Sequence, residues 1–505
     1  MIELKNINFR YKSKFSQAGL SDINLRVKPG ELVLLTGESG CGKSSILRVI
    51  NGLIPNYHEG DFSGQLVING KDCTGAEIYE ISSYVGSVFQ NPRTQFFNVD
   101  TTSELAFGCE NHAMPPEEIK EKIFQVADEF KITSLLGKNI FSLSGGEKQK
   151  IACASVVMTD TPIIILDEPS SNLDISAIEN LKAVLSEWKK QGKTIVVAEH
   201  RIYYLMDLID RMIYVNDGKI DREFSASEFK ALSKEEVCEL GLRVRDRNHI
   251  DFKGGGDSEF GCVGAGGCVG ASVVADADAS VDAGGPAEFH NQMDCESAVY
   301  EKAVCEYPGH RALDIDSLSF PLNSVIAVVG LNGSGKTTFS RSLCGLLKDK
   351  HSILTYKSEE FNWKKRIPMS YMVMQDVNHQ LFTETVLDEV LLSMVSPDKD
   401  VAMTCLEKLD LDSKSTRHPM TLSGGEKQRL AIASALVCDK KVFIFDEPTS
   451  GLDLRHMHEV SAQLKELACE DRCIFVVTHD YELMADCCDH FIEISDGKIV
   501  AQGSM

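Results

Sequence analysis

The chain carries the same series of motifs twice, in the same order, and this repeat limits the possible folds more than any other feature. The repeated stretches, in order, are 37–45 with 330–338, 143–149 with 422–428, 165–174 with 444–453, and 196–200 with 475–479. From the second stretch onward the copies keep a constant offset of 279 residues, which matches Ser144 with Ser423, Asp167 with Asp446, and His200 with His479. The sequence therefore predicts two domains of one type, with loops shortened in the second copy.

A change of composition separates the two copies. Residues 254–301 contain no Lys or Arg and are rich in Gly, Ala and Asp, which offers few apolar side chains to offset chain entropy. We therefore predict a first domain over residues 1–225 and a second over 296–505. Residues 226–295 are expected to form a short helical tail and a flexible acidic linker.

Composition excludes several classes of protein. Hydrophobic residues make up 43% of the 505 residues, as in ordinary globular chains. The net charge of −23 argues against a nucleic-acid partner, because phosphate backbones attract basic surfaces. No apolar run is long enough to span a bilayer, and the first residues lack the apolar core of a signal peptide. A chain that stays in the cytoplasm is expected.

The 16 cysteines show no metal-ligand spacing, so they are predicted to be reduced thiols that pack as small apolar residues. The same interpretation is applied to the neighbours Cys487 and Cys488. Cys41 lies within the first repeated stretch, where a small residue in a tight turn is favoured over an activated thiol.

Apolar runs alternate with segments of helical period, which predicts an α/β fold. The runs ELVLLT at 31–36, PIIIL at 162–166 and TIVVA at 194–198 are largely aliphatic, as in parallel strands that are buried on both faces. Residues 64–70, GQLVING, alternate and end in Asn-Gly, which predicts an antiparallel hairpin. No comparable pattern is evident in the second half.

Each copy contains a phosphate-binding loop of the form G-x-x-x-x-G-K-[ST], which follows an apolar strand and opens a helix. The glycines let backbone N–H groups converge on phosphates at the positive end of the helix. Lys43 and Lys336 are predicted to reach the β- and γ-phosphates, while Ser44 and Thr337 are predicted Mg²⁺ ligands.

Asp167 and Asp446 each end an aliphatic run and are predicted to hold Mg²⁺, since carboxylate oxygens suit this ion. Glu168 and Glu447 follow directly. The next side chain along a strand points the other way, so each glutamate is predicted to face the attacking water as a general base.

The combination of LSGGEKQ, an Asp-Glu-Pro sequence and a final Leu-Asp resembles the ATP-binding-cassette (ABC) ATPases, and the resemblance covers both halves. It implies tandem P-loop NTPase domains, each with a RecA-like core, a helical subdomain and a small antiparallel β-subdomain. It also implies that Gln90 and Gln375 sense metal and water and that His200 and His479 contact the γ-phosphate. The residues expected to bind ATP are Tyr11, Gly37, Gly40, Gly42, Lys43, Ser44, Ser45, Ser144, Gly145, Gly146, Tyr307, Gly330, Gly333, Gly335, Lys336, Thr337, Thr338, Ser423, Gly424 and Gly425.

In this family the LSGGE segment of one domain meets the γ-phosphate held by the other. The resemblance therefore implies two composite sites within one chain, which pair Lys43 with Ser423 and Lys336 with Ser144. Tyr11 and Tyr307 are expected to stack on adenine, although simple packing within a strand also explains them.

The residues after each metal-sensing glutamine resemble those of the ATPases of energy-coupling-factor (ECF) importers, which take up vitamins and transition-metal ions. Both copies read Q-x₄-Q, ending at Gln95 and Gln380, and apolar residues follow. The resemblance implies a docking groove for a transmembrane coupling subunit, which works with a separate substrate-binding membrane protein. It places the chain at the cytoplasmic face of the membrane. The apolar residues expected in the groove, or alternatively in the domain core, are Phe96, Phe97, Leu381 and Phe382.

Two other classes remain open. Tandem ATPases of sugar importers have a similar length, although a degenerate half would be expected in them. Soluble two-cassette ATPases that act in translation have a charged, helical linker, in contrast to the acidic one predicted here. No residue of the sequence identifies a transported substrate.

Overall fold

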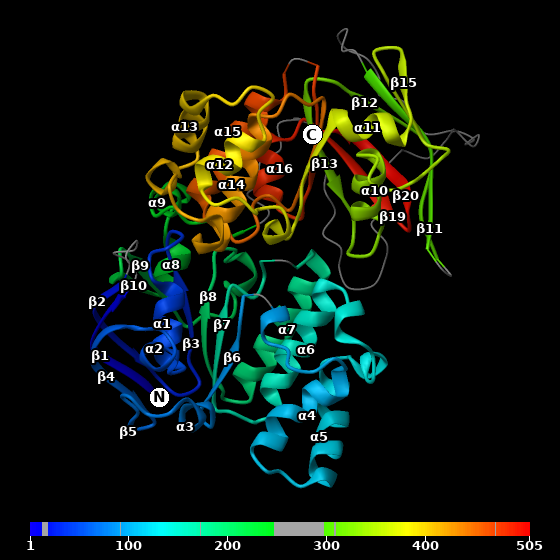
Figure 1. Cartoon of the computed structure of the whole chain (residues 1–505). Helices are drawn as coiled ribbons and strands as arrows, with labels where there is room; N and C mark the ends of the chain where they lie inside the picture. Colours follow the sequence, from blue (N-terminus) through cyan, green and yellow to red (C-terminus); the bar gives the residue numbers. More distant parts are fainter. Residues whose placement is uncertain (13–18, 91, 172, 247–296, 308–309, 470) are drawn as a thin grey trace, which may run out of the picture.

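The structure is a computed structural model that describes residues 1–12, 19–90, 92–171, 173–246, 297–307, 310–469 and 471–505. The predicted flexible linker, about 250–295, lies outside these residues. Figure 1 shows two units stacked on each other, one from each half of the sequence. The predicted tandem α/β fold is confirmed in both halves.

A six-stranded sheet forms the centre of each domain. In the first domain the order is β10-β9-β3-β8-β7-β6, and in the second it is β20-β19-β13-β18-β17-β16, so the topology is the same. All neighbouring strands pair in parallel except β10 and β20, which come last along the chain in their domains and run antiparallel to β9 and β19. The strands of the first sheet are β3 (Leu32–Thr36), β6 (Val85–Val88), β7 (Ile163–Asp167), β8 (Thr194–Ala198), β9 (Arg211–Asn216) and β10 (Lys219–Ser225). Those of the second are β13 (Ser324–Val329), β16 (Ser370–Val373), β17 (Val442–Asp446), β18 (Cys473–Val477), β19 (His490–Ser495) and β20 (Lys498–Ser504).

Both domains also contain a four-stranded antiparallel sheet, ordered β2-β1-β4-β5 and β12-β11-β14-β15. The expected hairpin at 64–70 is confirmed, with Asn69 and Gly70 at positive φ. The second half contains the corresponding hairpin, between β14 and β15. Its sequence did not predict the hairpin, because Lys357 and Ser358 occupy the two turn positions with positive φ angles. The strands are β1 (Ile2–Tyr11), β2 (Gly19–Val27), β4 (Gly60–Ile68), β5 (Lys71–Asp72), β11 (Ser297–Tyr307), β12 (His310–Pro321), β14 (Ile353–Tyr356) and β15 (Glu359–Phe361).

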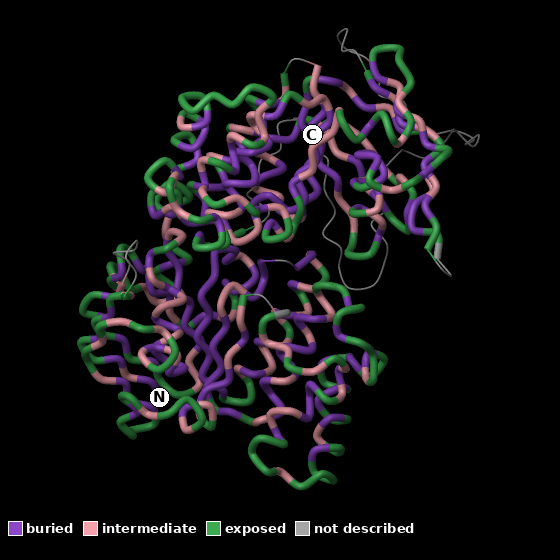
Figure 2. The backbone as a smooth tube through the Cα atoms, in the orientation of Figure 1, coloured by how far each residue is buried: buried purple, intermediate pink, exposed green. Residues whose placement is uncertain are grey.

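Helices cover the sheets and form a helical subdomain in each half. The first domain contains α1 (Lys43–Ile50), α2 (Leu53–Asn56), α3 (Ile78–Ser82), α4 (Thr101–Asn111), α5 (Pro116–Glu129), α6 (Gly145–Val157) and α7 (Ile175–Lys190). The second contains α10 (Lys336–Leu343), α11 (Trp363–Met369), α12 (Val386–Leu392), α13 (Lys399–Lys408), α14 (Gly424–Leu436), α15 (Leu454–Leu467) and α16 (Tyr481–Cys487). Figure 2 shows the buried residues concentrated in the central strands and the helices that face them.

A tail of two short helices, α8 (Ala226–Ala231) and α9 (Lys234–Glu239), follows β10. Phe229, Val237, Leu240 and Leu242 of this tail belong to the same buried cluster as the helices of the first domain. The tail is therefore packed as part of the first domain, and its last described residues reach the second domain.

The cysteines pack as predicted. All of the described cysteines except Cys238 and Cys469 are buried, and none of those described forms a disulfide. Cys487 and Cys488 lie in the core of the second domain, with their sulfur atoms 3.9 Å apart. In the described parts of the chain, no helix combines the length and the apolar character that a membrane span requires.

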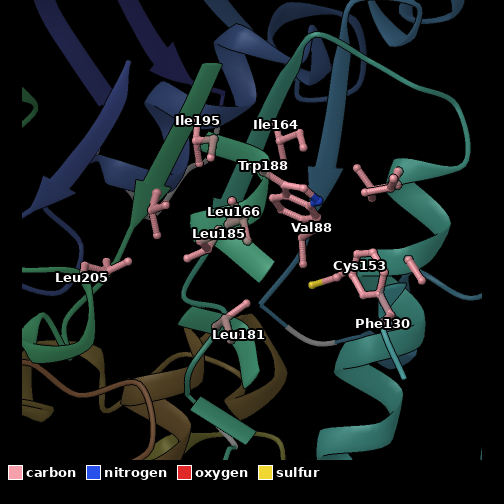
Figure 3. Close-up of a cluster of buried hydrophobic side chains, with 14 of the residues drawn as sticks. Val88, Phe130, Cys153, Ile164, Leu166, Leu181, Leu185, Trp188, Ile195 and Leu205 are labelled. Carbon is pink, nitrogen blue, oxygen red and sulfur yellow. The ribbon is translucent and has the colours of Figure 1, made fainter. Parts of the chain in front are cut away.

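The core of the first domain centres on α7, where Leu181, Leu185 and Trp188 pack against β7, β8 and the helical subdomain (Figure 3). Leu185 and Trp188 are completely buried.

We predict that Leu185→Ala lowers the free energy of unfolding by about 2–5 kcal/mol, through lost burial and the cavity left behind. Trp363 is the second of two tryptophans, so Trp363→Phe leaves Trp188 fluorescence to report denaturant unfolding of this domain. Lys190 is exposed on the same helix, so the control variant Lys190→Ala should change the free energy of unfolding little. Equal effects of the two variants would contradict the packing of Leu185 in the core.

Candidate active sites

The two phosphate-binding loops have the same geometry. Lys43 Nζ lies 2.9 Å from the carbonyl oxygen of Gly37 and 2.8 Å from that of Glu38. Lys336 Nζ makes the matching bonds to Gly330 and Leu331, at 2.7 and 2.8 Å. Each ammonium is held inside its loop at the N-terminus of α1 or α10, where anions bind favourably.

The first glycine of each loop is required by close packing. A Cβ on Gly37, at φ 144°, would lie 2.1 Å from the carbonyl oxygen of Val215, and one on Gly330, at φ 142°, would lie 2.1 Å from that of Ile494. Strands β9 and β19 therefore fix where each loop starts. Cys41 is buried in the first loop, and burial raises its thiol pKa, so the interpretation as a packing residue fits.

The proposed metal ligands of the first site lie together. Ser44 Oγ donates a hydrogen bond of 2.9 Å to Asp167 Oδ1, and a cavity of about 230 Å³ borders both residues and Gln90. Burial raises the pKa of Asp167, and it raises that of Asp446 to about 6 in the second site. Neighbouring hydroxyl and carboxylate oxygens fit the ligand preference of Mg²⁺, and a cation would stabilise these buried carboxylates in their charged form.

The two glutamates that follow take a position different from that of a continuing strand. Glu168 and Glu447 have positive φ angles of 44° and 52°, and their N–H groups bond to Ala198 and Val477 of the adjacent strand. The turn at each glutamate directs its side chain into the site. The expected alternation of side chains along a continuing strand is therefore not the reason for this orientation. Burial, together with the preceding aspartate, raises the pKa of Glu168 to about 8 and that of Glu447 to about 7.

The predicted switch histidines lie beside these glutamates. His200 Nε2 is 3.5 Å from Glu168 Oε1, and His479 Nε2 is 3.8 Å from Glu447 Oε1. Burial lowers the pKa of both histidines, to about 3 for His479, so both imidazoles are neutral. Gln90 Nε2 also donates to Glu168 Oε2, at 2.6 Å. Gln90 and Gln375 are both exposed, and Gln375 lies just after β16.

Each loop is completed by an aspartate of the opposite domain. The N–H of Ser39 in the first loop donates to Asp453 Oδ2 at 2.6 Å, and the N–H of Asn332 in the second donates to Asp174 Oδ2 at 2.9 Å. The other oxygen of each aspartate caps the helix that it precedes, α15 or α7. Neither aspartate was among the predicted site residues, although both stand seven residues after the predicted metal-binding aspartate of their own domain.

Further contacts bring the second domain against the first site. A Cβ on Gly451 would lie 3.0 Å from Glu168 Oε2 and 3.2 Å from Gln90 Nε2. Ser450 Oγ also donates to the carbonyl oxygen of Ser171. The two candidate sites therefore lie at the interface between the domains.

The LSGGE serines begin their helices. Ser144 and Ser423 cap α6 and α14 with reciprocal bonds to Glu147 and Glu426, and both serines are exposed. The glycines that follow them form the first turn. The expected contacts of Ser144 with the second loop and of Ser423 with the first remain predictions.

The tyrosines differ in their surroundings. The hydroxyl of Tyr11 lies 3.0 Å from Ser45 Oγ and 3.2 Å from Arg48, next to the first phosphate-binding loop. Tyr307 is 47% exposed at the end of β11. Stacking of either ring on adenine remains a prediction.

The residues predicted to form a docking groove divide into two groups. Gln95 bonds to Phe89 N and to the carbonyl oxygen of Ala152 in α6. Gln380 bonds to Met374 N and to the carbonyl oxygen of Met372 in β16. Leu381 is buried in the core of the second domain and Phe96 packs against the core of the first, as the alternative interpretation expected. In contrast, Phe97 and Phe382 are 77% and 73% exposed.

A buried glutamate fixes each exposed phenylalanine. Glu104 Oε2 accepts hydrogen bonds from Phe97 N and Asn98 N, at 3.0 and 2.8 Å. Glu389 Oε2 accepts from Phe382 N and Thr383 N, at 3.1 and 3.0 Å. Both loops therefore present an aromatic side chain on a backbone that is held in place.

Paired phosphate-binding loops, with acidic residues and histidines at the ends of parallel strands, define a tandem P-loop NTPase. The family model described as ABC transporter matches residues 20–171 and 313–450. The chain therefore belongs to the ABC transporter family, binds ATP and is an ATPase.

Known proteins match the whole length of the chain. A putative ABC transporter ATP-binding protein of Treponema denticola is 42% identical over 99% of this chain and 97% of its own length. A similarly described protein of Methanosarcina acetivorans is 30% identical over 99% of this chain and 85% of its own. A model of ribosome-bound archaeal Pelota and ABCE1 matches 98% of this chain and 78% of that one, with 21% identity and a TM-score of 0.66, which shows the shared fold.

We predict that Asp453→Ala lowers ATP turnover about 10- to 100-fold at saturating ATP. Burial acts to raise the pKa of Asp453, but hydrogen bonds from His456 and Ser39 hold that pKa far below its usual range. The lost contact with the loop is therefore charge-assisted, for which about 1.5–3 kcal/mol is expected. Asp453→Asn should lose less, because it keeps an acceptor oxygen. The exposed Asp207→Ala serves as the control, and turnover of Asp453→Ala equal to that control would exclude a role for this contact.

Proposed function

We propose that the chain is the ATP-hydrolysing subunit of an importer of the ECF type, at the cytoplasmic face of the membrane. In this proposal its two domains form one intramolecular sandwich around two ATP molecules and drive a separate transmembrane coupling subunit. A further membrane protein captures the substrate, a vitamin or a transition-metal ion. The observation that carries the proposal is the reciprocal contact of each phosphate-binding loop with an aspartate of the other domain, within one chain.

In the proposed mechanism the loops and lysines bind the phosphates, and Glu168 and Glu447 orient the attacking water and accept its proton. The neutral imidazoles of His200 and His479 lie beside these glutamates and each donates its single N–H toward the γ-phosphate. Ser44, Asp167 and Gln90 would hold Mg²⁺ in the first site, as Thr337, Asp446 and Gln375 would in the second. The ion supplies charge stabilisation to the phosphates. The residues LSGGE of the opposite domain close each site.

The exposed Phe97 and Phe382 support the proposed docking of the coupling subunit. One such residue lies in each helical subdomain, on a loop held by Glu104 or Glu389. An exposed aromatic side chain on a fixed backbone suits a groove that accepts an apolar helix face. We assign the docking contact to these two residues and a supporting role to Gln95 and Gln380.

The alternatives from the sequence are a tandem ATPase of another importer, such as one for sugars, and a two-cassette ATPase in translation. The similarity to archaeal ABCE1 concerns the fold, which all three classes share. The matched motifs in both halves and the two exposed phenylalanines favour the ECF type.

We expect the double variant Glu168→Gln/Glu447→Gln to bind ATP normally but to hydrolyse it at least about 100-fold more slowly. The amide keeps the side-chain shape but cannot accept the proton, and general base catalysis contributes about 10²–10⁴-fold. ATP turnover and equilibrium binding of a fluorescent ATP analogue measure the two effects.

Light scattering of the same double variant with ATP tests the intramolecular sandwich. A mass of one chain, 55.7 kDa, is expected, because both domains come from one molecule. A mass of two chains would refute the intramolecular arrangement, and unchanged turnover would refute the role of the glutamates. Glu117→Gln on the surface of α5 controls for the substitution itself.

A second prediction concerns docking. Phe97→Ala/Phe382→Ala should weaken capture of the coupling subunit about tenfold or more while ATP binding and basal turnover are kept, because both side chains are exposed and lie outside the phosphate sites. Co-purification of the membrane partner with tagged variants measures the effect.

Phe124→Ala removes a phenylalanine that is 65% exposed on α5, and it should leave the complex intact. Equal capture by the double variant and this control would contradict the docking surface. Loss of capture through truncation within residues 250–295 alone would instead identify the acidic segment as the docking element.

A further inference from the structure

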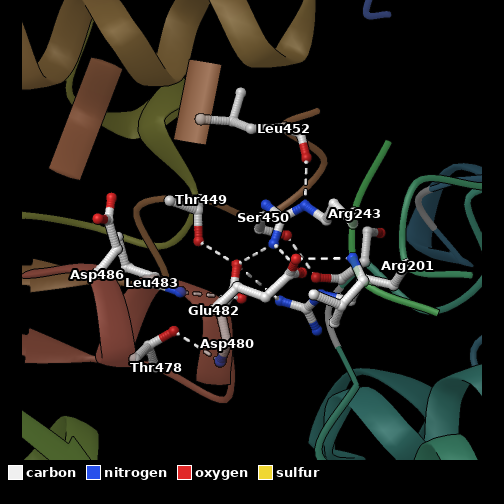
Figure 4. Close-up of polar contacts among 12 residues, drawn as sticks. Arg201, Arg243, Thr449, Ser450, Leu452, Thr478, Asp480, Glu482, Leu483 and Asp486 are labelled. Carbon is white, nitrogen blue, oxygen red and sulfur yellow. Dashed lines mark hydrogen bonds and ion pairs between the residues drawn. The ribbon is translucent and has the colours of Figure 1, made fainter. Parts of the chain in front are cut away.

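Four charged side chains form a buried cluster where the tail of the first domain meets the second domain (Figure 4). Arg201 and Arg243 come from the first domain and its tail, and Asp480 and Glu482 come from the start of α16. The side chains of Arg243 and Asp480 are only 2% and 3% exposed. Two positive and two negative charges balance within the cluster.

Arg243 makes contact with two segments of the second domain. Its Nη1 lies 2.6 Å from Asp480 Oδ2 and 3.3 Å from Glu482 Oε2, while its Nε donates to the carbonyl oxygen of Leu452 at 3.1 Å. The next residue, Val244, donates its N–H to Glu482 Oε1 at 2.8 Å. The preceding Leu242 belongs to the core of the first domain, so the tail is anchored on both sides of the interface.

The Asp480 carboxylate connects Arg243 with the second ATP site. Asp480 directly follows His479, and its Oδ2 also accepts a hydrogen bond of 2.7 Å from Thr449, two residues after Glu447. Burial alone would raise the pKa of Asp480, but Arg243 and Arg201 hold it at about 2. A charged Asp480 thus joins the tail to the segments that carry the proposed base and switch histidine.

The segment around the first switch histidine is held by a glutamate of its own domain, although the Arg201 side chain also lies 3.9 Å from Asp480. Glu199, which precedes His200, accepts hydrogen bonds from Ser170 N at 3.3 Å, His200 N at 2.8 Å, Arg201 N at 3.2 Å and the Tyr204 hydroxyl at 3.0 Å. All of these groups belong to the first domain. At the matching positions the second domain has Thr478 in place of Glu199 and Asp480 in place of Arg201.

We infer that Arg243 is a positioning residue for the second ATP site, where it holds Asp480 so that His479 and Glu447 adopt their working arrangement only while the tail is docked. The inference rests on the proposed roles of Glu447 and His479. It makes the two sites unequal: the first carries its own support, and the second depends on the end of the first domain.

The physical reason is the cost of uncompensated buried charge. Without Arg243, Asp480 and Glu482 retain Arg201 as the nearby cation, at 3.9 Å from Asp480. Two buried carboxylates with weak pairing are strongly unfavourable, so α16 has to shift or admit water. His479 is joined to that helix through Asp480 and moves with it, and small displacements of catalytic groups cost up to about 100-fold in rate.

The test compares Arg243→Ala with Arg245→Ala in the full-length chain carrying Glu168→Gln, so that turnover reports on the second site. Arg245 lies two residues further along the same tail and bonds to the carbonyl oxygens of Phe229 and Leu232, within the first domain. Arg243→Ala should lower kcat for ATP about 10- to 100-fold with a change in KM below about threefold. Arg245→Ala, which removes an equal charge, should leave kcat close to that of the parent.

Hydrogen exchange locates the effect. With an ATP analogue that cannot be hydrolysed between the β- and γ-phosphates, Arg243→Ala should increase amide exchange in residues 478–484 but not in residues 199–205. Equal increases in both segments would show that Arg243 only holds the domains together, and no increase in 478–484 would also overturn the inference. If Arg243→Ala does not fold, Arg243→Lys keeps a cation but not the fork geometry, and an intermediate kcat with the same exchange pattern is expected.

Glu447→Gln, added to the same Glu168→Gln chain, separates this inference from the proposed function. Loss of turnover in Glu447→Gln with normal exchange in 478–484 supports the site assignment. Retained turnover in that variant would refute the assignment, whereas unchanged kcat and exchange in Arg243→Ala would refute the positioning role alone. Asp480→Asn should resemble Arg243→Ala, and the combination of both should be no worse than either alone, because they break one shared contact.

Discussion

Backbone N–H groups at the start of a helix need acceptors, and a loop built to hold phosphate leaves several of them exposed. In this protein the acceptor for one N–H of each loop comes from the other domain, as a carboxylate oxygen of Asp453 or Asp174. The second oxygen of each aspartate caps its own helix, so the carboxylate is fixed before the domains meet. These two equivalent contacts fix the distance between the domains and place both sites at their interface.

Much of the fold could be predicted from sequence because it depends on local patterns. Aliphatic runs became buried parallel strands, and Asn-Gly became the turn at residues 69–70. The hairpin of the second domain was missed because Lys357 and Ser358 occupy the same positive-φ turn. Neither residue favours that conformation, so the surrounding sheet, in which β14 pairs with β11, has to stabilise it. A turn that is stabilised by tertiary contacts leaves no trace in its own sequence.

The candidate sites likewise contain some residues that the sequence predicts and others that it does not. The positions of the loops, acidic residues and histidines followed from motifs that are continuous in sequence. Asp174 and Asp453 could not be assigned in that manner, because each acts on residues 158 and 414 positions away. The docking residues were predicted as one group, yet Gln95 and Leu381 stabilise the interior while Phe97 and Phe382 are exposed. Adjacent residues of a loop point in different directions, and spacing alone does not show which of them face solvent.

The tandem arrangement permits an interface that two identical chains could not form. In a twofold interface residue i contacts residue j and j contacts i, and only a residue that lies on the axis faces its own equivalent. Ser171 and Ser450 are equivalent positions, 279 residues apart, and they contact each other across the interface in this way.

Arg201 and Asp480 are also equivalent, and their side chains approach to 3.9 Å. In a dimer of identical domains this position would place arginine against arginine or aspartate against aspartate, which is repulsive when buried. Two distinct copies can place opposite charges there, so the divergence of the duplicated domains provides the physical basis for two unequal sites.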